Sequence, residues 1–155
     1  MASFRIGLIS DTHGLLRPQA VAALQGSDFI VHAGDIGDPA ILERLAGIAP
    51  LTAVRGNNDS AAGFLRLADS AWLQVGSQRI LVLHDIAALD AVPDAGGASV
   101  VIHGHSHKPA VERRGGVLYV NPGSAGPRRF RLPVGLAHLT VRGSQLAAEL
   151  LPLAV

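Results

Sequence analysis

Short apolar runs alternate with amphipathic stretches over the first 60 residues. The apolar runs at 4–10, 28–34 and 51–56 are each typical of a buried strand that ends in polar or glycine residues. The stretches between them, 17–25 and 39–46, predict helices. Strands that alternate with helices in this order predict a parallel sheet.

The second predicted helix has clear start and stop residues. Asp38 stands at the N-cap position, Pro39 occupies the first helical position, and Gly47 follows the last apolar residue. A capping role therefore accounts for Asp38 better than a functional role does.

The second half of the chain is mostly β. Residues 71–84 are typical of a hairpin that turns at Gly76 and Ser77, and further strands joined by glycine-containing turns are expected within 98–104, 116–121 and 134–153. No repeat, low-complexity tract or linker divides the sequence. We therefore expect one domain over residues 1–155, in which two sheets pack together and are flanked by helices.

Composition narrows the function classes. A chain of 155 residues that is 48% hydrophobic and 16% charged is expected to be globular. A net charge of +1 and 4% aromatic residues give no strong indication of nucleic-acid or membrane binding. No segment has the roughly 20 apolar residues that span a bilayer, and the N-terminal apolar run is too short for a signal peptide, so we expect a cytoplasmic protein.

Polar side chains that bind metals follow five of the predicted strands. Asp11 and His13 follow the first, Asp35 the second, and the other three ends contain Asn57, His84, and the pair His105 and His107. Because ligands bind beyond the carboxyl ends of strands in open α/β sheets, these side chains are expected to converge. The histidine-rich segment alone has a chance cluster as its alternative, but five such strand ends favour a metal site. The chain has no cysteine, so its ligands would be nitrogen and oxygen atoms.

The motifs DTH, GDIGD, GNND, LHD and GHSH occur in that order between residues 11 and 107. In this order they resemble the calcineurin-like metallophosphoesterase superfamily. The short length and the NPGS sequence at 121–124 are similar to its small bacterial and archaeal phosphodiesterases of the YfcE type. The resemblance implies an α/β fold, a four-layer α/β/β/α sandwich of two mixed sheets, and a metal-dependent phosphoesterase.

The same resemblance implies two divalent cations held by seven residues. One cation would be bound by Asp11, His13 and His107 and the other by Asn57, His84 and His105, with the carboxylate of Asp35 bridging the two. The mixed nitrogen and oxygen set suits Mn, Fe, Zn, Co or Ni better than Mg. Manganese is the first expectation, because similar proteins are often activated by Mn.

Two adjacent cations can share a water, lower its pKa and present hydroxide to a phosphoric ester. The expected substrate is a small phosphoric diester, and the candidate catalytic residues are Asp35, Asn58 and Asp59. Asp59 is expected to orient a ligand imidazole. Asn58 stands where many relatives have histidine and cannot deliver a proton, so activated leaving groups are expected to react best. Asp85 stands where glycine often follows the ligand histidine, which affects the expected shape of the substrate pocket.

Other polar residues have simpler explanations. His32, His103 and His138 are interpreted as packed histidines within strands, and the arginines of the 128–131 segment, Arg128, Arg129 and Arg131, as a solvated basic loop that is able to meet a substrate phosphate. A phosphomonoesterase with the same metals remains an alternative function, as does a protein-interaction scaffold with this fold. The complete ligand set favours an enzyme over a scaffold. The hairpin at 71–83 is a candidate surface for a homo-oligomer.

Overall fold

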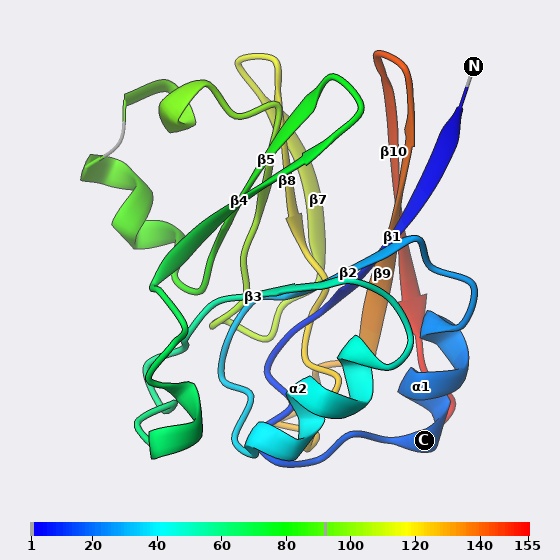
Figure 1. Cartoon of the computed structure of the whole chain (residues 1–155), viewed down its shortest axis with the longest axis vertical. Helices are drawn as coiled ribbons and strands as arrows, with labels where there is room; N and C mark the ends of the chain where they lie inside the picture. Colours follow the sequence, from blue (N-terminus) through cyan, green and yellow to red (C-terminus); the bar gives the residue numbers. More distant parts are fainter. Residues whose placement is uncertain (1, 92) are drawn as a thin grey trace.

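The computed structural model describes residues 2–91 and 93–155, and two five-stranded sheets form its centre (Figure 1). The first sheet has the order β10 (Gln145–Pro152), β9 (Gly135–Arg142), β1 (Ser3–Ile9), β2 (Phe29–His32) and β3 (Leu51–Ala53). Strands β1, β2 and β3 are parallel, as the alternating pattern predicts, while β9 runs antiparallel to both β1 and β10.

The second sheet has the order β4 (Ser70–Val75), β5 (Gln78–Leu83), β6 (Val100–Ile102), β8 (Val117–Asn121) and β7 (Ala110–Arg114). Its three inner strands are parallel, and each edge strand pairs antiparallel with its neighbour. The predicted hairpin at Gly76 and Ser77 is present as β4 and β5. Strand β7 was not predicted, because four of its five residues are exposed and it lacks an alternating apolar pattern.

Two α-helices cover the outer face of the first sheet: α1 (Pro18–Leu24) and α2 (Pro39–Ala46). The start of α2 is as predicted, since the Asp38 side chain accepts a hydrogen bond of 2.9 Å from the Ala40 N–H and Pro39 follows it. Three short 3₁₀ helices complete the chain: η1 (Ala62–Phe64), η2 (Ile86–Ala91) and η3 (Pro93–Gly97).

Three apolar clusters hold these layers together. The largest lies between the sheets and includes Ile6, Val31, Val82 and Ile102. A second cluster joins the first sheet to its helices, and a third lies on the outer face of the second sheet, where Leu89 of η2 packs against it. The predicted four-layer sandwich is confirmed, with the difference that 3₁₀ turns form the outer layer on the second sheet.

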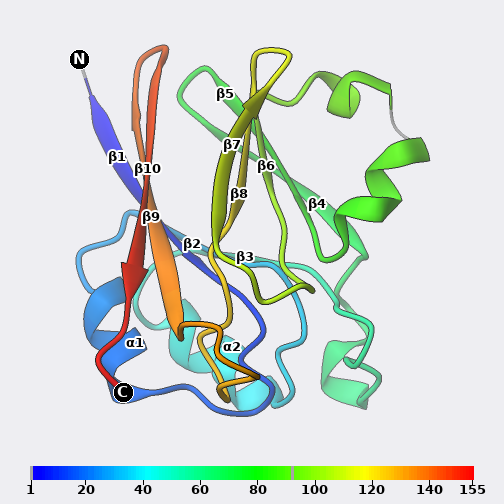
Figure 2. The same cartoon turned by 180° about the vertical axis from the view of Figure 1, so that it is seen from behind.

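The parallel strands of both sheets end in the lower half of the molecule (Figures 1 and 2). The hydrogen bonds from the Asp11 N–H to the Gly34 carbonyl and from the Gly104 N–H to the His84 carbonyl tie the loops that follow these strands to one another. No helix within the described residues has the length and apolar character needed to cross a membrane.

Candidate metal centre

The loops that follow the parallel strands have an unusual backbone. Seven non-glycine residues of the described chain have positive φ, and five of them are predicted metal ligands: Asp11, His13, Asp35, His105 and His107. Such a conformation is disfavoured by roughly 1–3 kcal/mol for a residue with a Cβ atom, and it persists only where the surroundings enforce it. Strand β6 ends at Ile102, so His105 and His107 follow the strand as predicted, and left-handed turns direct their side chains.

Four predicted ligands meet at one side of the site. The Nε2 atoms of His13 and His107 lie 3.3 Å apart, and Asp11 Oδ1 lies 3.7 Å from the former and 3.4 Å from the latter. Asp35 Oδ2 also lies 3.7 Å from His13 Nε2. These imidazole and carboxylate atoms therefore surround one small volume, as ligands of a single cation do.

His84 extends this group on its other side. Its Nε2 atom lies 3.2 Å from Asp35 Oδ2 and 3.9 Å from Asp11 Oδ1. The ring of His105 meets the ring of His84 edge to face, with centroids 5.2 Å apart, but its side chain is 47% exposed. Asp35 thus lies between the pair His13 and His107 and the pair His84 and His105, which is the position expected of a carboxylate that bridges two cations.

The protonation of His84 follows from its partners. Its Nδ1 atom lies 2.7 Å from the carbonyl of Ala33, to which it donates, so in the neutral imidazole Nε2 carries the lone pair and faces Asp35. Both this Nε2 atom and Asp11 Oδ1 are buried without a hydrogen-bond partner. Two buried acceptors without donors are costly unless a cation satisfies them. The donor set therefore fits divalent metal ions.

Electrostatics support the same conclusion. Burial raises the pKa of the Asp11 carboxyl, because its charged form lacks solvation. Burial acts on Asp35 in the same direction, but the adjacent His84 ring and the hydrogen bond from the Asn58 N–H hold the pKa of Asp35 below its ordinary value. Burial lowers the pKa of His107, which keeps this imidazole neutral and able to bind a metal.

The predicted catalytic residue Asp59 binds backbone N–H groups. Its buried carboxylate accepts hydrogen bonds from the N–H groups of Ile36, Gly37 and Gly56, at 3.1, 3.1 and 2.9 Å. The first two belong to the loop after β2 and the third to the loop after β3. Asp59 therefore fastens two ligand-bearing loops together, where we had expected it to orient an imidazole.

Asn57, Asn58 and Asp85 lie at the open side of the site. Asn58 donates to both carboxylate oxygens of Asp35, through its N–H at 2.9 Å and its Nδ2 at 3.1 Å. Asn57 is exposed and lines a cleft of about 360 Å³ together with His84 and His105. Asp85 lines the same cleft, and its Oδ2 lies 3.9 Å from His105 Nε2.

Three residues that the sequence analysis did not single out hold Asp11 and the GHSH loop in place. Ser10 Oγ donates to Asp11 Oδ2 at 2.6 Å, and Ser124 Oγ donates to the Asp11 carbonyl at 2.9 Å. Asn121 Nδ2 donates to the Gly104 carbonyl at 3.1 Å. The NPGS sequence after β8 contained two of these residues, but nothing in the sequence indicated their partners.

Gly104 allows the two sheets to approach each other at the site. A Cβ atom at this position would overlap Ser10 Oγ and lie 2.6 Å from Asp11 Oδ2. Gly56 allows a similarly close approach between two loops of the first sheet, where a Cβ atom would overlap the Asp35 carboxylate. The glycines of the GHSH and GNND motifs are thus required by the close packing of backbone against ligand side chains.

The histidines that were interpreted as packed residues lie outside the group of predicted ligands. His32 is fully buried, accepts from the Gly34 N–H at Nδ1 and donates through Nε2 to Thr12 Oγ1 at 3.0 Å. Burial lowers the pKa of His32 to about 3 and that of His103 to about 4. His138 donates from Nε2 to the carbonyl of Ala23 and links β9 to α1.

The three arginines of the 128–131 segment, Arg128, Arg129 and Arg131, are exposed, as expected of a solvated loop. The charge of Arg129 adds to burial in lowering the pKa of His107, so this guanidinium is close enough for its field to reach the site.

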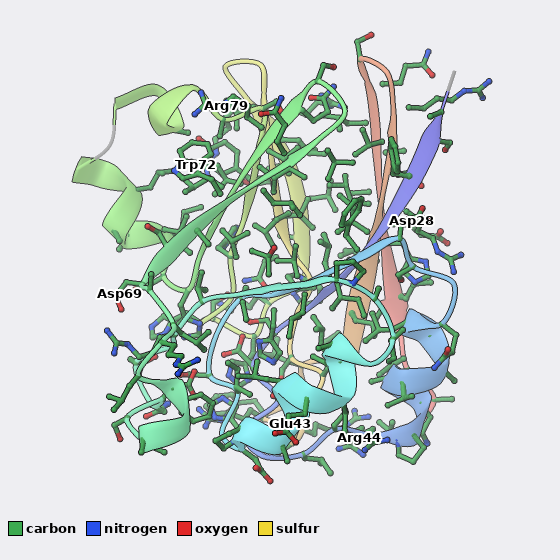
Figure 3. The ribbon with its side chains drawn as sticks, viewed as in Figure 1. Asp28, Glu43, Arg44, Asp69, Trp72 and Arg79 are labelled. Carbon is green, nitrogen blue, oxygen red and sulfur yellow. The ribbon has the colours of Figure 1, made fainter. Side chains whose placement is uncertain are left out.

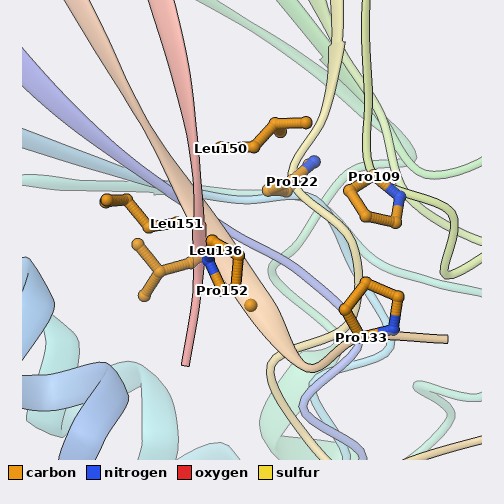
Figure 4. A pocket seen from close by; sticks show the side chains of 8 residues that line it. Pro109, Pro122, Pro133, Leu136, Leu150, Leu151 and Pro152 are labelled. Atoms are coloured by element: carbon orange, nitrogen blue, oxygen red, sulfur yellow. The ribbon is translucent and has the colours of Figure 1, made fainter. Parts of the chain in front are cut away.

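A separate pocket of about 100 Å³ lies between the ends of β9 and β10 and the turn after β8 (Figure 4). Prolines and leucines line it, and none of its lining residues is titratable.

Comparisons with known proteins agree with this geometry. The model of the calcineurin-like phosphoesterase superfamily domain matches residues 4–144. A probable metallophosphoesterase of Methanothermobacter thermautotrophicus is 34% identical over 94% of this chain and 91% of its own length. Phosphodiesterase YfcE of Escherichia coli is 32% identical over 74% of this chain and 76% of its own length.

Solved structures share the fold. Vps29 of Chaetomium thermophilum superposes with a TM-score of 0.79 at 22% identity, over 94% of each chain. The structure of E. coli YfcE superposes with a TM-score of 0.70 at 23% identity, over 95% of this chain and 99% of that one.

Proposed function

This chain belongs to the calcineurin-like phosphoesterase superfamily, and we propose that it hydrolyses small phosphoric diesters with two divalent cations. The observation that carries this proposal is the pair of buried acceptors without donors, Asp11 Oδ1 and His84 Nε2, which lie 3.9 Å apart in a cluster with Asp35. Such a pair is costly in a buried site unless a cation satisfies it.

Each predicted ligand has a place in this proposal. Asp11, His13 and His107 would hold one cation, Asn57, His84 and His105 the other, and Asp35 both. When bound, two such cations stabilise negative charge on the phosphoryl oxygens and lower the pKa of a water that they share. Nitrogen and oxygen ligands suit manganese, which is our first choice of metal, as well as iron, zinc, cobalt or nickel.

The protein side chains determine which esters react. Asn58 directs an amide N–H toward the bridging carboxylate and has no proton to transfer. The leaving oxygen must therefore depart as an anion or take its proton from water. This favours esters of acidic alcohols such as phenols.

The test compares hydrolysis of bis(p-nitrophenyl) phosphate and p-nitrophenyl phosphate by chelator-treated protein before and after Mn²⁺ is restored. We expect diester turnover that requires metal and is lost in Asp35→Asn and in His105→Ala. Asp38→Asn is the matched control, because asparagine also caps helices and the N-cap bond to Ala40 is retained.

Two results would contradict the proposal. Faster hydrolysis of the monoester would make the chain a phosphomonoesterase with the same ligands. If bound Mn²⁺ is measured and neither ester is hydrolysed, a binding or scaffolding role would be favoured.

A further inference from the structure

A further cavity of about 220 Å³ lies on the outer face of the second sheet, next to the metal centre. Its floor comes from the β4 and β5 hairpin, in which Trp72 pairs with Leu81 and Ser70 with Leu83. Ala88 and Leu89 of η2 form its wall. We call this cavity the Trp72 pocket.

The Trp72 pocket adjoins the metal cleft. Asp69, Leu83 and Ala88 line both cavities. Leu83 directly precedes the ligand His84, and Leu81 lies three residues before it. At about 3.3 Å per residue along a strand, the row of Trp72 and Leu81 lies roughly 10 Å from His84. That span suits a phosphate in the cleft and one planar group beside it.

The indole of Trp72 is positioned to stack on a planar group of a ligand. It is the only tryptophan of the chain and is 45% exposed. The Arg79 guanidinium carbon lies 4.6 Å from the centre of its ring, and Figure 3 shows the two side chains next to each other, with Asp69 at the start of β4. Arg79 does not line the pocket, so it orients the indole without filling the space.

The charges around the Trp72 pocket disfavour a ligand that carries a second anionic group besides its phosphate. Asp69 is the one charged residue of its lining within the described chain, and it stands at the boundary with the cleft. The Arg55 guanidinium binds this carboxylate at 3.1 Å. No cation therefore lines the pocket itself, and leucine, alanine and indole surfaces remain for an uncharged occupant.

We infer that the Trp72 pocket binds a planar aromatic substituent of the diester whose phosphate lies at the metal centre. The inference rests on the proposed function and names its substrate class: diesters with an uncharged aryl or nucleoside group. A volume of about 220 Å³ is below the roughly 300–1,000 Å³ of whole-ligand sites, as a subsite for one substituent should be. A diester offers such a group in addition to its leaving group, whereas a monoester does not.

The emission of Trp72 reports occupancy directly, because the protein has no other tryptophan. Mn²⁺-loaded protein is titrated with diphenylphosphinate, whose P–C bonds are not hydrolysed, with the methyl ester of thymidine 5′-phosphate and with dimethyl phosphate. We expect the first two probes to change the emission to saturation and dimethyl phosphate to leave it unchanged. The aromatic probe that binds more tightly identifies the source of the ring, aryl or nucleoside.

Two variants test whether the aromatic probes bind in the Trp72 pocket. Leu89→Ala keeps the fluorophore but removes one wall, and we expect it to weaken binding of the better aromatic probe about tenfold, the effect of roughly one lost stacking or apolar contact. Trp72→Ala, followed by calorimetry, should weaken it at least as much and leave binding of dimethyl phosphate unchanged. Val111→Ala, an exposed apolar residue on the opposite edge strand β7, is the matched control.

The outcomes separate this inference from the proposed function. If bis(p-nitrophenyl) phosphate is hydrolysed but neither aromatic probe alters Trp72 emission or depends on Leu89 and Trp72, the inference is overturned and the function stands. If the aromatic probes bind at Trp72 and neither p-nitrophenyl ester is hydrolysed, the pocket is a ligand site and the proposed function fails.

Discussion

The carboxylate of Asp59 offers the sharpest test of how the metal centre is built. In Asp59→Asn, the amide oxygen can keep the position that accepts from Ile36 and Gly56, but the NH₂ group then faces the Gly37 N–H. One charge-assisted hydrogen bond is lost, two others are weakened, and two donors oppose each other in a buried place.

The expected loss follows from these contacts. Hydrogen bonds to a charged group contribute about 1.5–3 kcal/mol each, and a buried donor without an acceptor costs about 1–3 kcal/mol. Because the amide retains two of the three bonds, we expect the free energy of unfolding to fall by about 2–4 kcal/mol. For a chain of this length that corresponds to a melting temperature lowered by roughly 5–15 °C.

Urea denaturation followed by circular dichroism, in the presence of a chelator, measures this change without any contribution from bound metal. Asp38→Asn is the control, since its amide oxygen can still accept from the Ala40 N–H. Equal stability of Asp59→Asn and Asp38→Asn would refute the reasoning. A variant that lost only turnover and not stability would show that Asp59 acts in catalysis rather than on the loop backbone.

Three further predictions concern other parts of the same site. Because burial lowers the pKa of His32 from about 6.5 to about 3, the unfolded chain takes up a proton that the folded one does not, so the free energy of unfolding should fall by about 2 kcal/mol between pH 7 and pH 5. His32→Gln, which does not titrate, should remove this part of the pH dependence, and an unchanged urea-midpoint profile would contradict the assignment. Gly104→Ala should weaken Mn²⁺ binding about tenfold or more by displacing Asp11, measured by calorimetry against Gly47→Ala, whose added Cβ meets only ordinary contacts. Diester hydrolysis rates should fall steeply as the pKa of the leaving group rises, since Asn58 delivers no proton; a flat dependence would argue against this role.

Much of the fold could be predicted because local patterns and tertiary packing agree. The strand ends at Asp11 and Asp35, the cap at Asp38 and the hairpin turn at Gly76 each follow from residues close together in the sequence. Strand β7 is the exception, since charged edge strands lack the apolar alternation of buried ones. Its turn at Gly115 and Gly116, both with positive φ, is typical of a two-residue hairpin and was the available indication.

The site could be predicted in its residue types but not in its geometry. Motif order indicated the candidate ligands, yet the left-handed backbone of His105 and His107 depends on contacts with Asp11 and Asn121, which lie far away in the sequence. The three backbone partners of Asp59 could not be predicted for the same reason, because no local sequence pattern indicates which N–H groups a buried carboxylate will contact. The extension of the cleft toward Trp72 likewise required the packing of η2 on the second sheet.

The chain order of the first sheet has a consequence for how the protein folds. Strand β1 lies between β2 and β9, and the pairing of Ser3 with Arg142 joins residues from almost opposite ends of the chain. During synthesis, one edge of β1 therefore stays unpaired until the whole second sheet and β9 have been made. Contacts so distant in sequence slow folding, and an open apolar edge meanwhile favours aggregation. The hairpin of β9 and β10 thus completes the first sheet, and its synthesis ends the period in which this edge of β1 is open to aggregation.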